Sequence, residues 1–308
     1  MALPDHVRQL AARVSNTGRW GPDDQRGTLN LVDAAAVLRG VAAAREGRVF
    51  SLAIPFDEDG PQTGAIPGRD NPRRTMLAVN APYTRDPAGF CANDDVVTMG
   101  VQAATHWDAL AHVSYEGRLY NGVEASTVDE RGASRLGIEH FGPLVTRGIV
   151  ADVARAHGVD HFDDGHAITA DDLDAAVALA GVTVRPGDAL LVRTGQMHFL
   201  RQGDRERFAN PSPGLSTRSV EWLHDHGIAA VATDTLVFEV WPPEEPDVLL
   251  PVHLLHLVDM GLPQGQLWAL DDLAVDCAAD GRYEVLLCAT PLPLTRSVGG
   301  PVAPTAVK

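Results

Sequence analysis

The chain has 308 residues, and its 45% hydrophobic and 6% aromatic content is typical of a globular protein rather than a disordered or fibrous one. Its 41 acidic and 25 basic residues give a formal net charge of -16, which disfavours binding to nucleic acid or to an anionic membrane. Three cysteines form no CxxC pair, and no apolar run has the length of a signal-peptide core or a membrane span, so we expect a cytoplasmic protein.

Predicted helices and strands alternate from the N-terminus. Asp5 is the N-cap expected for a first helix, in which apolar residues recur at helical spacing. Asp33 caps a second predicted helix, and a strand is expected over residues 48–56. The polar segment 57–75 follows. Its length predicts a long loop, a lid or an oligomerisation arm rather than a simple connection.

The second half of the chain continues this alternation. Thr169 and Asp172 have the spacing of a capping box, and Gly227 is the expected end of another helix. Because no linker or repeat interrupts the pattern, we expect one α/β domain over residues 1–308. The remaining predicted strands are 94–102, 142–153, 187–195, 228–234 and 283–292, and the predicted helices are 169–181, 216–227, 251–261 and 271–281.

One short segment, QAATHWDALAH, groups residues that bind metals. Gln102, His106, Asp108 and His112 all have even numbers, so an extended backbone would turn the four side chains to one face. Neutral imidazoles and a carboxylate together suit Zn²⁺, Mn²⁺ or Fe²⁺. The spacing alone leaves ordinary core or surface histidines as an alternative. Phosphate-loop, dinucleotide-binding and nucleophile-elbow motifs are absent from the sequence.

The same segment resembles the HxGTHxDxPxH motif of the cyclase-like metal-dependent hydrolases, a family that includes bacterial kynurenine formamidase and isatin hydrolase. Four further segments resemble this family in the same order: RWGPDDQRGTLNLVD, GDALLVRTG, ATDTLVFE and LPVHLLHLVDMGLPQGQLWALDDLA. The resemblance implies a single α/β domain with a mixed sheet of the swivelling β/β/α type. It also implies a homodimer or homotetramer that acts on a small molecule.

The resemblance assigns roles to four residues. His106 and Asp108 match the central histidine and aspartate ligands of the family, and His112 matches the third motif histidine. His253, in the fourth of the further segments, matches the downstream histidine ligand. The counterpart of Asp108 can bridge two ions in the family. The counterparts of His112 and His253 serve a second ion or the reacting water.

Two glutamines depart from the family pattern. Gln102 stands where the family usually has its first histidine, as in a subgroup that carries glutamine there, and Gln266 stands where it usually has a glutamate ligand. A glutamine can ligate through its amide oxygen, but it has no charge and is a poor base. Three arrangements remain open: one ion on His106 and Asp108 with Gln102, one ion on Asp108, His112 and His253 near Gln266, or a metal-free polar pocket.

The chemistry implied is hydrolysis with one divalent ion, Mn²⁺ or Zn²⁺. Such an ion activates water against an amide, imide, lactam or lactone bond of a small cyclic or aryl substrate. His112 is then either a ligand or the residue that takes and returns the proton, and Asp108 is a ligand on either view. The alternative function is that of a metal-free homologue that binds or cyclises a small polyketide-like molecule.

Three aromatic residues are candidates for contacts with the substrate: Trp20, Trp107 and Phe238. Their rings could stack on a planar substrate, although large aromatic side chains mostly pack in cores. Glu239, next to the last of them, either lines the same pocket or simply ends a strand.

Overall fold

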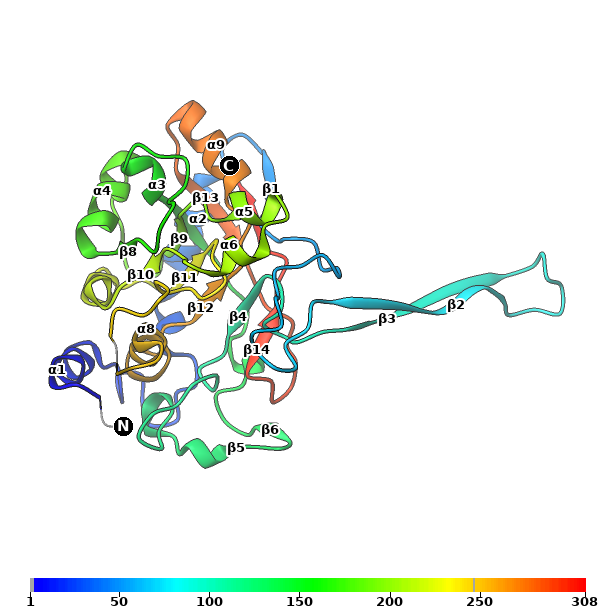
Figure 1. Ribbon diagram of the computed structural model, residues 1–308, viewed down its shortest axis with the longest axis horizontal. Helices are drawn as coiled ribbons and strands as arrows, with labels where there is room; N and C mark the ends of the chain where they lie inside the picture. The colour runs from blue at the N-terminus through cyan, green and yellow to red at the C-terminus, as the bar shows by residue number, and fades with distance from the viewer. Residues whose placement is uncertain (1–2, 246) are drawn as a thin grey trace.

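The computed structural model describes residues 3–245 and 247–308, and within them nine strands form one mixed sheet (Figure 1). β7, β9, β11 and β12 pair in parallel at its centre, and the other neighbours pair antiparallel. The mixed α/β sheet expected from the resemblance is therefore confirmed. The strand order is β1 (Val49–Ser51), β15 (Thr305–Val307), β13 (Glu284–Cys288), β7 (Val145–Asp152), β9 (Ala189–Arg193), β11 (Ala230–Thr233), β12 (Gln264–Gln266), β4 (His106–Asp108) and β14 (Gly299–Pro301).

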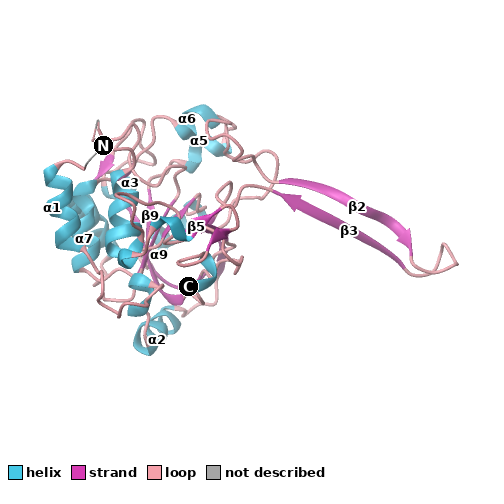
Figure 2. Ribbon diagram, turned by 90° about the horizontal axis from the view of Figure 1, so that it is seen from below, coloured by secondary structure: helices cyan, strands magenta, loops and turns pink. Residues whose placement is uncertain are grey.

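The helices lie around this sheet (Figure 2). The α-helices are α1 (Asp5–Val14), α2 (Ala34–Ala43), α3 (Val153–Ala156), α4 (Ala170–Ala180), α5 (Met197–Arg201), α6 (Arg205–Ala209), α7 (Val220–Asp225), α8 (Pro251–His253) and α9 (Asp271–Asp280). Short 3-10 helices are η1 (Gly27–Leu31), η2 (Tyr120–Gly122), η3 (Ala125–Thr127), η4 (Ile138–His140) and η5 (Thr217–Ser219). None of the described helices combines the length and the apolar character that a membrane crossing requires.

Alternation along the central strands divides the core in two. In β9, Leu190 and Val192 pack with α1, α4 and α7, whereas Ala189 and Leu191 pack with α9. Successive side chains of a strand point to opposite faces, so a fully buried strand contributes to a core on each side. All five residues of β9 are buried, and the strand lies within the predicted range 187–195. The sheet is thereby fixed between two apolar layers.

Two of the three predicted N-terminal caps match the structure, whereas Asp5 was wrong, because Pro4 is the N-cap of α1 and Asp5 lies inside the helix. Asp33 accepts a hydrogen bond from the backbone N–H of Ala36 at 2.8 Å, and Thr169 and Asp172 form the expected capping box at the start of α4. Gly227 follows α7 with a φ of 64°, a left-handed conformation that favours glycine. The helix predicted over residues 251–261 begins as α8 and continues as the π-helix η6 (Leu254–Met260).

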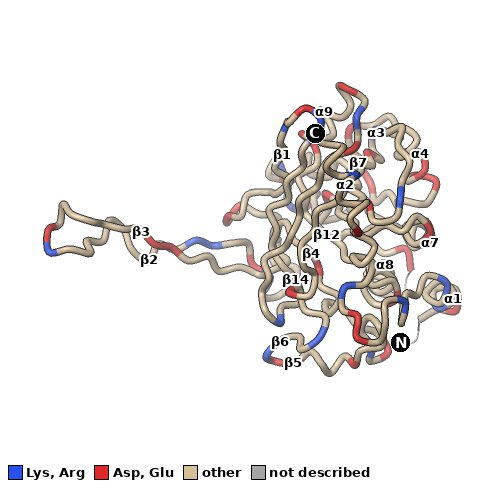
Figure 3. The backbone as a smooth tube through the Cα atoms, turned by 180° about the vertical axis from the view of Figure 1, so that it is seen from behind, with Lys and Arg blue, Asp and Glu red and all other residues tan. Residues whose placement is uncertain are grey.

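A long hairpin projects from the body of the molecule (Figures 1 and 2). It consists of β2 (Arg73–Pro82) and β3 (Cys91–Thr98), and the predicted arm 57–75 leads into it. Charged residues of both signs occur along it (Figure 3). The role of this region in oligomerisation stays a prediction. Exposed apolar residues of the hairpin are Met76, Leu77, Val79, Tyr83, Phe90, Val96 and Val97.

Two further two-stranded sheets lie beside the main one. β8 (Ala167–Ile168) pairs in parallel with β10 (Gly214–Leu215), and β5 (Val128–Asp129) pairs antiparallel with β6 (Gly132–Ala133). The β8–β10 pair is the link between the start of α4 and the segment that precedes α7.

A buried carboxylate in η6 makes stability depend on pH. Tyr115 donates a hydrogen bond to Asp259 Oδ1 at 2.7 Å, while Oδ2 is buried without a partner among the described residues. Burial raises the pKa of Asp259 to about 6. Because the folded chain holds this proton more tightly than the unfolded chain, stability is lost as the pH rises from about 4 through about 6.

Asp259→Asn is therefore expected to increase the free energy of unfolding by about 1–2 kcal/mol at pH 8 and to give no gain below pH 4. Urea unfolding at pH 4, 6 and 8 measures this difference. Asp23→Asn, at a side chain that is 97% exposed, is the control. A pH profile of Asp259→Asn that is identical to that of the wild type would refute the prediction.

Candidate metal centre

The centre is built on β4, which lies between β12 and β14. His106 pairs with Gln266, and Asp108 pairs with Gly299. Because residues two apart in a strand share a face, His106 and Asp108 point to the same side of the sheet. Both side chains are almost completely buried. A three-residue strand between two neighbours thus fixes the imidazole and the carboxylate relative to each other.

The extended backbone predicted over residues 102–112 was wrong outside β4. Turns flank the strand on both sides, with hydrogen bonds from Ala103 N–H to the Gly100 carbonyl and from His112 N–H to the Ala109 carbonyl. These turns still bring Gln102 and His112 to the centre, where Gln102 Nε2 lies 3.4 Å from His112 Nδ1. The four even-numbered side chains do meet there, but turns rather than strand periodicity place Gln102 and His112.

Two imidazoles converge on one carboxylate oxygen. The Nε2 atoms of His106 and His112 lie 3.5 Å and 3.7 Å from Asp108 Oδ1. His106 Nε2 and Asp108 Oδ1 are buried, and neither has a hydrogen-bond partner in the part of the chain that the structure describes. Buried polar atoms are nearly always paired, so two such atoms facing each other require an explanation. A cation between them provides one.

The tautomers of two histidines are fixed by acceptors behind them. His106 Nδ1 lies 2.7 Å from the Ala104 carbonyl, and His253 Nδ1 lies 2.5 Å from Glu239 Oε1. Since a carbonyl and a carboxylate only accept, the neutral form of each ring carries its proton on Nδ1 and a lone pair on Nε2. Metal-bound histidines usually have such an acceptor on the other nitrogen. His106 and His253 are thus prepared as Nε2 ligands.

Glutamine amides occupy the other oxygen of Asp108. Gln266 donates to Oδ2 at 2.8 Å, and Gln264 approaches it at 3.4 Å. Gln266 Nε2 also lies 3.4 Å from His253 Nε2. In this arrangement Gln266 supports Asp108 through its nitrogen, and only a flipped amide would offer an oxygen ligand. The glutamines leave Asp108 Oδ1 free to face the imidazoles.

Electrostatics favour the metal-binding forms of Asp108 and His112. Burial alone would raise the pKa of Asp108, but His112, His106 and His253 together hold the pKa well below its usual range. Burial lowers the pKa of His112, so its imidazole is neutral at pH 7. A charged carboxylate and neutral imidazoles are the forms that bind a divalent metal.

Arg69 is a residue near the centre that the sequence patterns did not identify. It is half-buried, and its positive charge acts on both Asp108 and His112. Its side chain lies over Gly100, where a Cβ atom would be 3.3 Å from Arg69 Cγ. Arg69 belongs to the predicted arm 57–75. No local motif marks a lone arginine in a polar loop, so only the fold reveals its position.

The aromatic predictions had different outcomes. Phe238 is buried, with its ring edge-on to His253 at 5.9 Å between centroids, and so it lies beside the centre. Trp107 was a wrong assignment, because alternation in β4 sends it to the opposite face, where it packs against Phe141 and Trp268. Trp20 is half-buried with Arg19 over its ring at 4.8 Å, and its contact with a substrate stays a prediction.

Gly299 makes room for Gln102. A Cβ atom at this position would lie 2.5 Å from Gln102 Nε2 and 3.2 Å from the backbone oxygen of Trp107. Gly299→Ala is therefore expected to push the amide away from His112 and to lower kcat/KM about tenfold, and the same loss is expected for Gln102→Ala. The double variant is expected to show no further loss, because both changes remove the same contact. Additive losses in steady-state kinetics would contradict this account.

Comparisons with known proteins agree with this geometry. A family model described as Putative cyclase matches residues 50–240. A solved structure described as a novel cyclase is 37% identical, with 96% of this chain and 100% of that chain covered and a TM-score of 0.87. Isatin hydrolase A from Ralstonia solanacearum is 20% identical, with coverages of 89% and 97% and a TM-score of 0.61.

A predicted metal-dependent hydrolase from Bacillus stearothermophilus is 19% identical, with coverages of 85% and 98% and a TM-score of 0.53. At such low identity, the similarity of this chain to the Bacillus hydrolase and to isatin hydrolase A shows a shared fold alone. Among curated proteins, no relative matches the sequence.

Proposed function

The chain belongs to the cyclase family whose model and solved structure it matches, and we propose that it is a metal-dependent hydrolase. The substrate class that we propose is a small cyclic or aryl compound with an amide, imide, lactam or lactone bond. One observation carries the proposal: His106 Nε2 and Asp108 Oδ1 face each other, buried and without a partner among the described residues. Isatin hydrolase has the same fold.

We assign the ligand role to His106, Asp108 and His253. Two of these are imidazoles whose Nδ1 atoms are bound to fixed acceptors, and the third is a carboxylate with one unoccupied oxygen. Imidazole and carboxylate donors of this kind suit Zn²⁺ or Mn²⁺. Among the described residues, ligand atoms of these three side chains do not all lie within 4.8 Å of one another, so they have to move closer together to share one ion. When bound, such an ion lowers the pKa of water towards neutrality and polarises a carbonyl group.

His112 is the residue that moves the proton in this proposal. Its Nδ1 lies 3.4 Å from the amide nitrogen of Gln102, and its side chain is 19% exposed, against 1% for His106. A neutral imidazole at the open side of the centre can accept a proton from water and return it to the leaving group. Burial favours that neutral form at pH 7. Phe238 is buried and packs edge-on against His253.

The test begins with protein stripped by a chelator and reloaded with Mn²⁺ or Zn²⁺. Metal content after gel filtration is compared between the wild type and His106→Ala, and activity is measured on aryl formamides, lactams, cyclic imides and lactones. The expected result is one ion fewer in the variant, together with turnover of at least one class only in the loaded wild type. Equal metal content and no turnover of any class would overturn the proposal.

We propose that the hairpin β2–β3 joins copies of the chain into a homodimer or homotetramer. Its strands carry apolar side chains exposed to solvent, including Leu77 at 68% and Phe90 at 66%. Exposed apolar surface of this kind is typical of protein contacts. Light scattering on a variant in which a short Gly-Ser turn replaces residues 77–94 is expected to show a monomer. The same mass as the wild type would exclude this role.

A further inference from the structure

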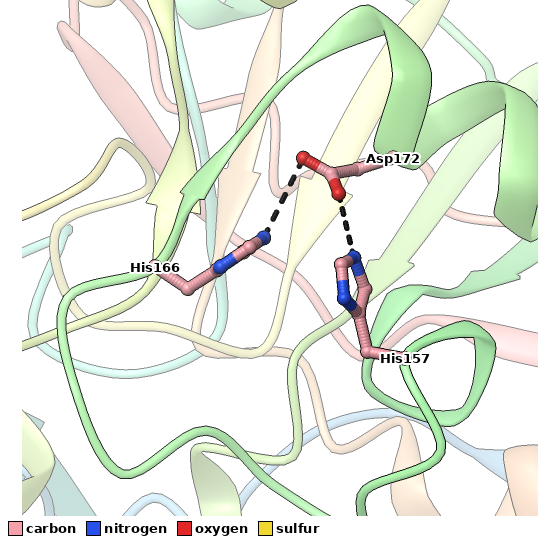
Figure 4. A group of neighbouring side chains, drawn as sticks. All are labelled: His157, His166 and Asp172. Atoms are coloured by element: carbon pink, nitrogen blue, oxygen red, sulfur yellow. Dashed lines mark hydrogen bonds and ion pairs between the residues drawn. The ribbon is translucent and has the colours of Figure 1, made fainter.

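A second group of metal-binding side chains lies at α3, β8 and α4, apart from β4 (Figure 1). It consists of His157 directly after α3, His166 directly before β8, and Asp172 in the first turn of α4. One ligand atom from each residue lies within 4.8 Å of the other two. Figure 4 shows both imidazoles turned towards the one carboxylate.

The distances place the two rings on different oxygens. His157 Nε2 lies 2.6 Å from Asp172 Oδ1, and His166 Nε2 lies 3.5 Å from Oδ2. The first contact is a good hydrogen bond, but the second is too long for one. His166 Nε2 is nevertheless buried, and the described residues give it no partner. In this cluster the His157 imidazole is therefore hydrogen-bonded to Asp172, whereas His166 Nε2 faces the carboxylate without a hydrogen bond.

Packing holds the rings in these positions. His166 stacks on Phe162 with 4.2 Å between centroids and an interplanar angle of 1°, and His157 meets the same ring edge-on at 5.5 Å. Thr169 holds Asp172 Oδ2 with its backbone N–H at 2.7 Å and its hydroxyl at 2.8 Å. The three side chains are thus oriented by neighbours outside the cluster, as ligands of a metal site are.

A transition-metal ion fits this group. Bonds of 2.0–2.2 Å from nitrogen and carboxylate oxygen place neighbouring ligand atoms about 3.3 Å apart, so small shifts of the present positions suffice. The side chains of His157 and His166 are 37% and 26% exposed, which leaves an open side for water ligands. Two imidazoles and a carboxylate suit Zn²⁺, Co²⁺, Ni²⁺ or Cu²⁺ better than Mg²⁺ or Ca²⁺.

We propose that His157, His166 and Asp172 form a second divalent-metal site, suited to Zn²⁺, that clamps the segment between α3 and α4. The ion would join three points of the chain that lie within residues 157–172. The backbone oxygen of His166 also accepts a hydrogen bond from Gly214 at 3.1 Å, so the clamp extends to β10. This site is independent of the proposed hydrolase centre and has a structural role.

The test compares Zn²⁺ binding by calorimetry in four full-length proteins. These are the wild type, the double variant His157→Asn/His166→Gln, the central variant Asp108→Asn, and His224→Asn. His224→Asn is the matched control, because His224 lies beside a single aspartate, Asp225, at 3.0 Å. Circular dichroism verifies that the double variant is folded. Asp172 is left in place because it caps α4.

We expect the double variant to bind one Zn²⁺ fewer than the wild type and His224→Asn. We expect Zn²⁺ to raise the Tm of the wild type and of Asp108→Asn by several degrees more than that of the double variant. Turnover by the Mn²⁺-loaded double variant is expected to stay within twofold of the wild type. Equal Zn²⁺ binding by the double variant and the wild type would overturn the site. A lower Zn²⁺ stoichiometry of Asp108→Asn concerns the hydrolase centre and does not enter the comparison between the double variant and the wild type.

Discussion

Asp108→Asn is expected to abolish metal binding at the β4 centre and to lower turnover about 1,000-fold or more. The carboxylate is the only charged ligand in the proposed set, and its Oδ1 faces His106 and His112. An amide at this position carries no charge and can donate to His106 Nε2, which would then lose its free lone pair. A bound ion contributes several kcal/mol to a hydrolytic transition state, and a loss of that size corresponds to this fold-change.

The fold is expected to survive this substitution. The asparagine oxygen can keep the hydrogen bond that Gln266 now donates to Oδ2 at 2.8 Å. The matched control is Asp259→Asn, which also replaces a buried carboxylate but lies outside the centre. Metal analysis, steady-state kinetics and thermal unfolding of both variants separate the two effects. A fully active, metal-loaded Asp108→Asn enzyme would eliminate Asp108 as a ligand.

Glu239→Gln is expected to weaken metal binding 10- to 100-fold and to destabilise the protein by about 1–3 kcal/mol. Glu239 is 2% exposed and accepts three hydrogen bonds, from Val252 N–H at 3.0 Å, His253 N–H at 2.9 Å and His253 Nδ1 at 2.5 Å. A glutamine has one acceptor oxygen, so at least one of the two backbone donors loses its partner. Its NH₂ group can also reverse the tautomer of His253 and place a proton on Nε2.

The readouts of this variant distinguish its two consequences. The dissociation constant of Mn²⁺ reports on the orientation of His253, whereas urea unfolding reports on the lost hydrogen bond. Glu221→Gln, at a side chain that is 51% exposed, serves as the control and is expected to change neither quantity. If Glu239→Gln binds Mn²⁺ as tightly as the wild type, Glu239 does not position His253 for a metal.

Local sequence signals predicted the features that depend on a few neighbouring residues. The cap at Asp33 and the capping box of Thr169 and Asp172 need only three-residue spacings, and both occur as predicted. His106 and Asp108 share a face because β4 is extended between them. The same alternation places Trp107 on the opposite face. Its position between His106 and Asp108 in the sequence was therefore evidence against a contact with the substrate.

Long-range pairing determined what the sequence patterns did not predict. The register of β4 with β12 brings Gln266 beside His106, and the register with β14 places Gly299 opposite Asp108. Neither register follows from a local pattern, because the strands are far apart in the chain. Glu239 meets His253 only after the chain has turned into α8, and Arg69 reaches the centre from a loop. The sequence left the role of Glu239 open and gave no signal for Arg69.

Anomalous diffraction from a crystal of the full chain grown with Mn²⁺ tests the metal centre most directly. The account predicts one strong peak about 2.0–2.3 Å from His106 Nε2, Asp108 Oδ1 and His253 Nε2, with His112 alongside and not bound to the ion. A map without a peak among these atoms, in crystals grown with a molar excess of Mn²⁺, would contradict it.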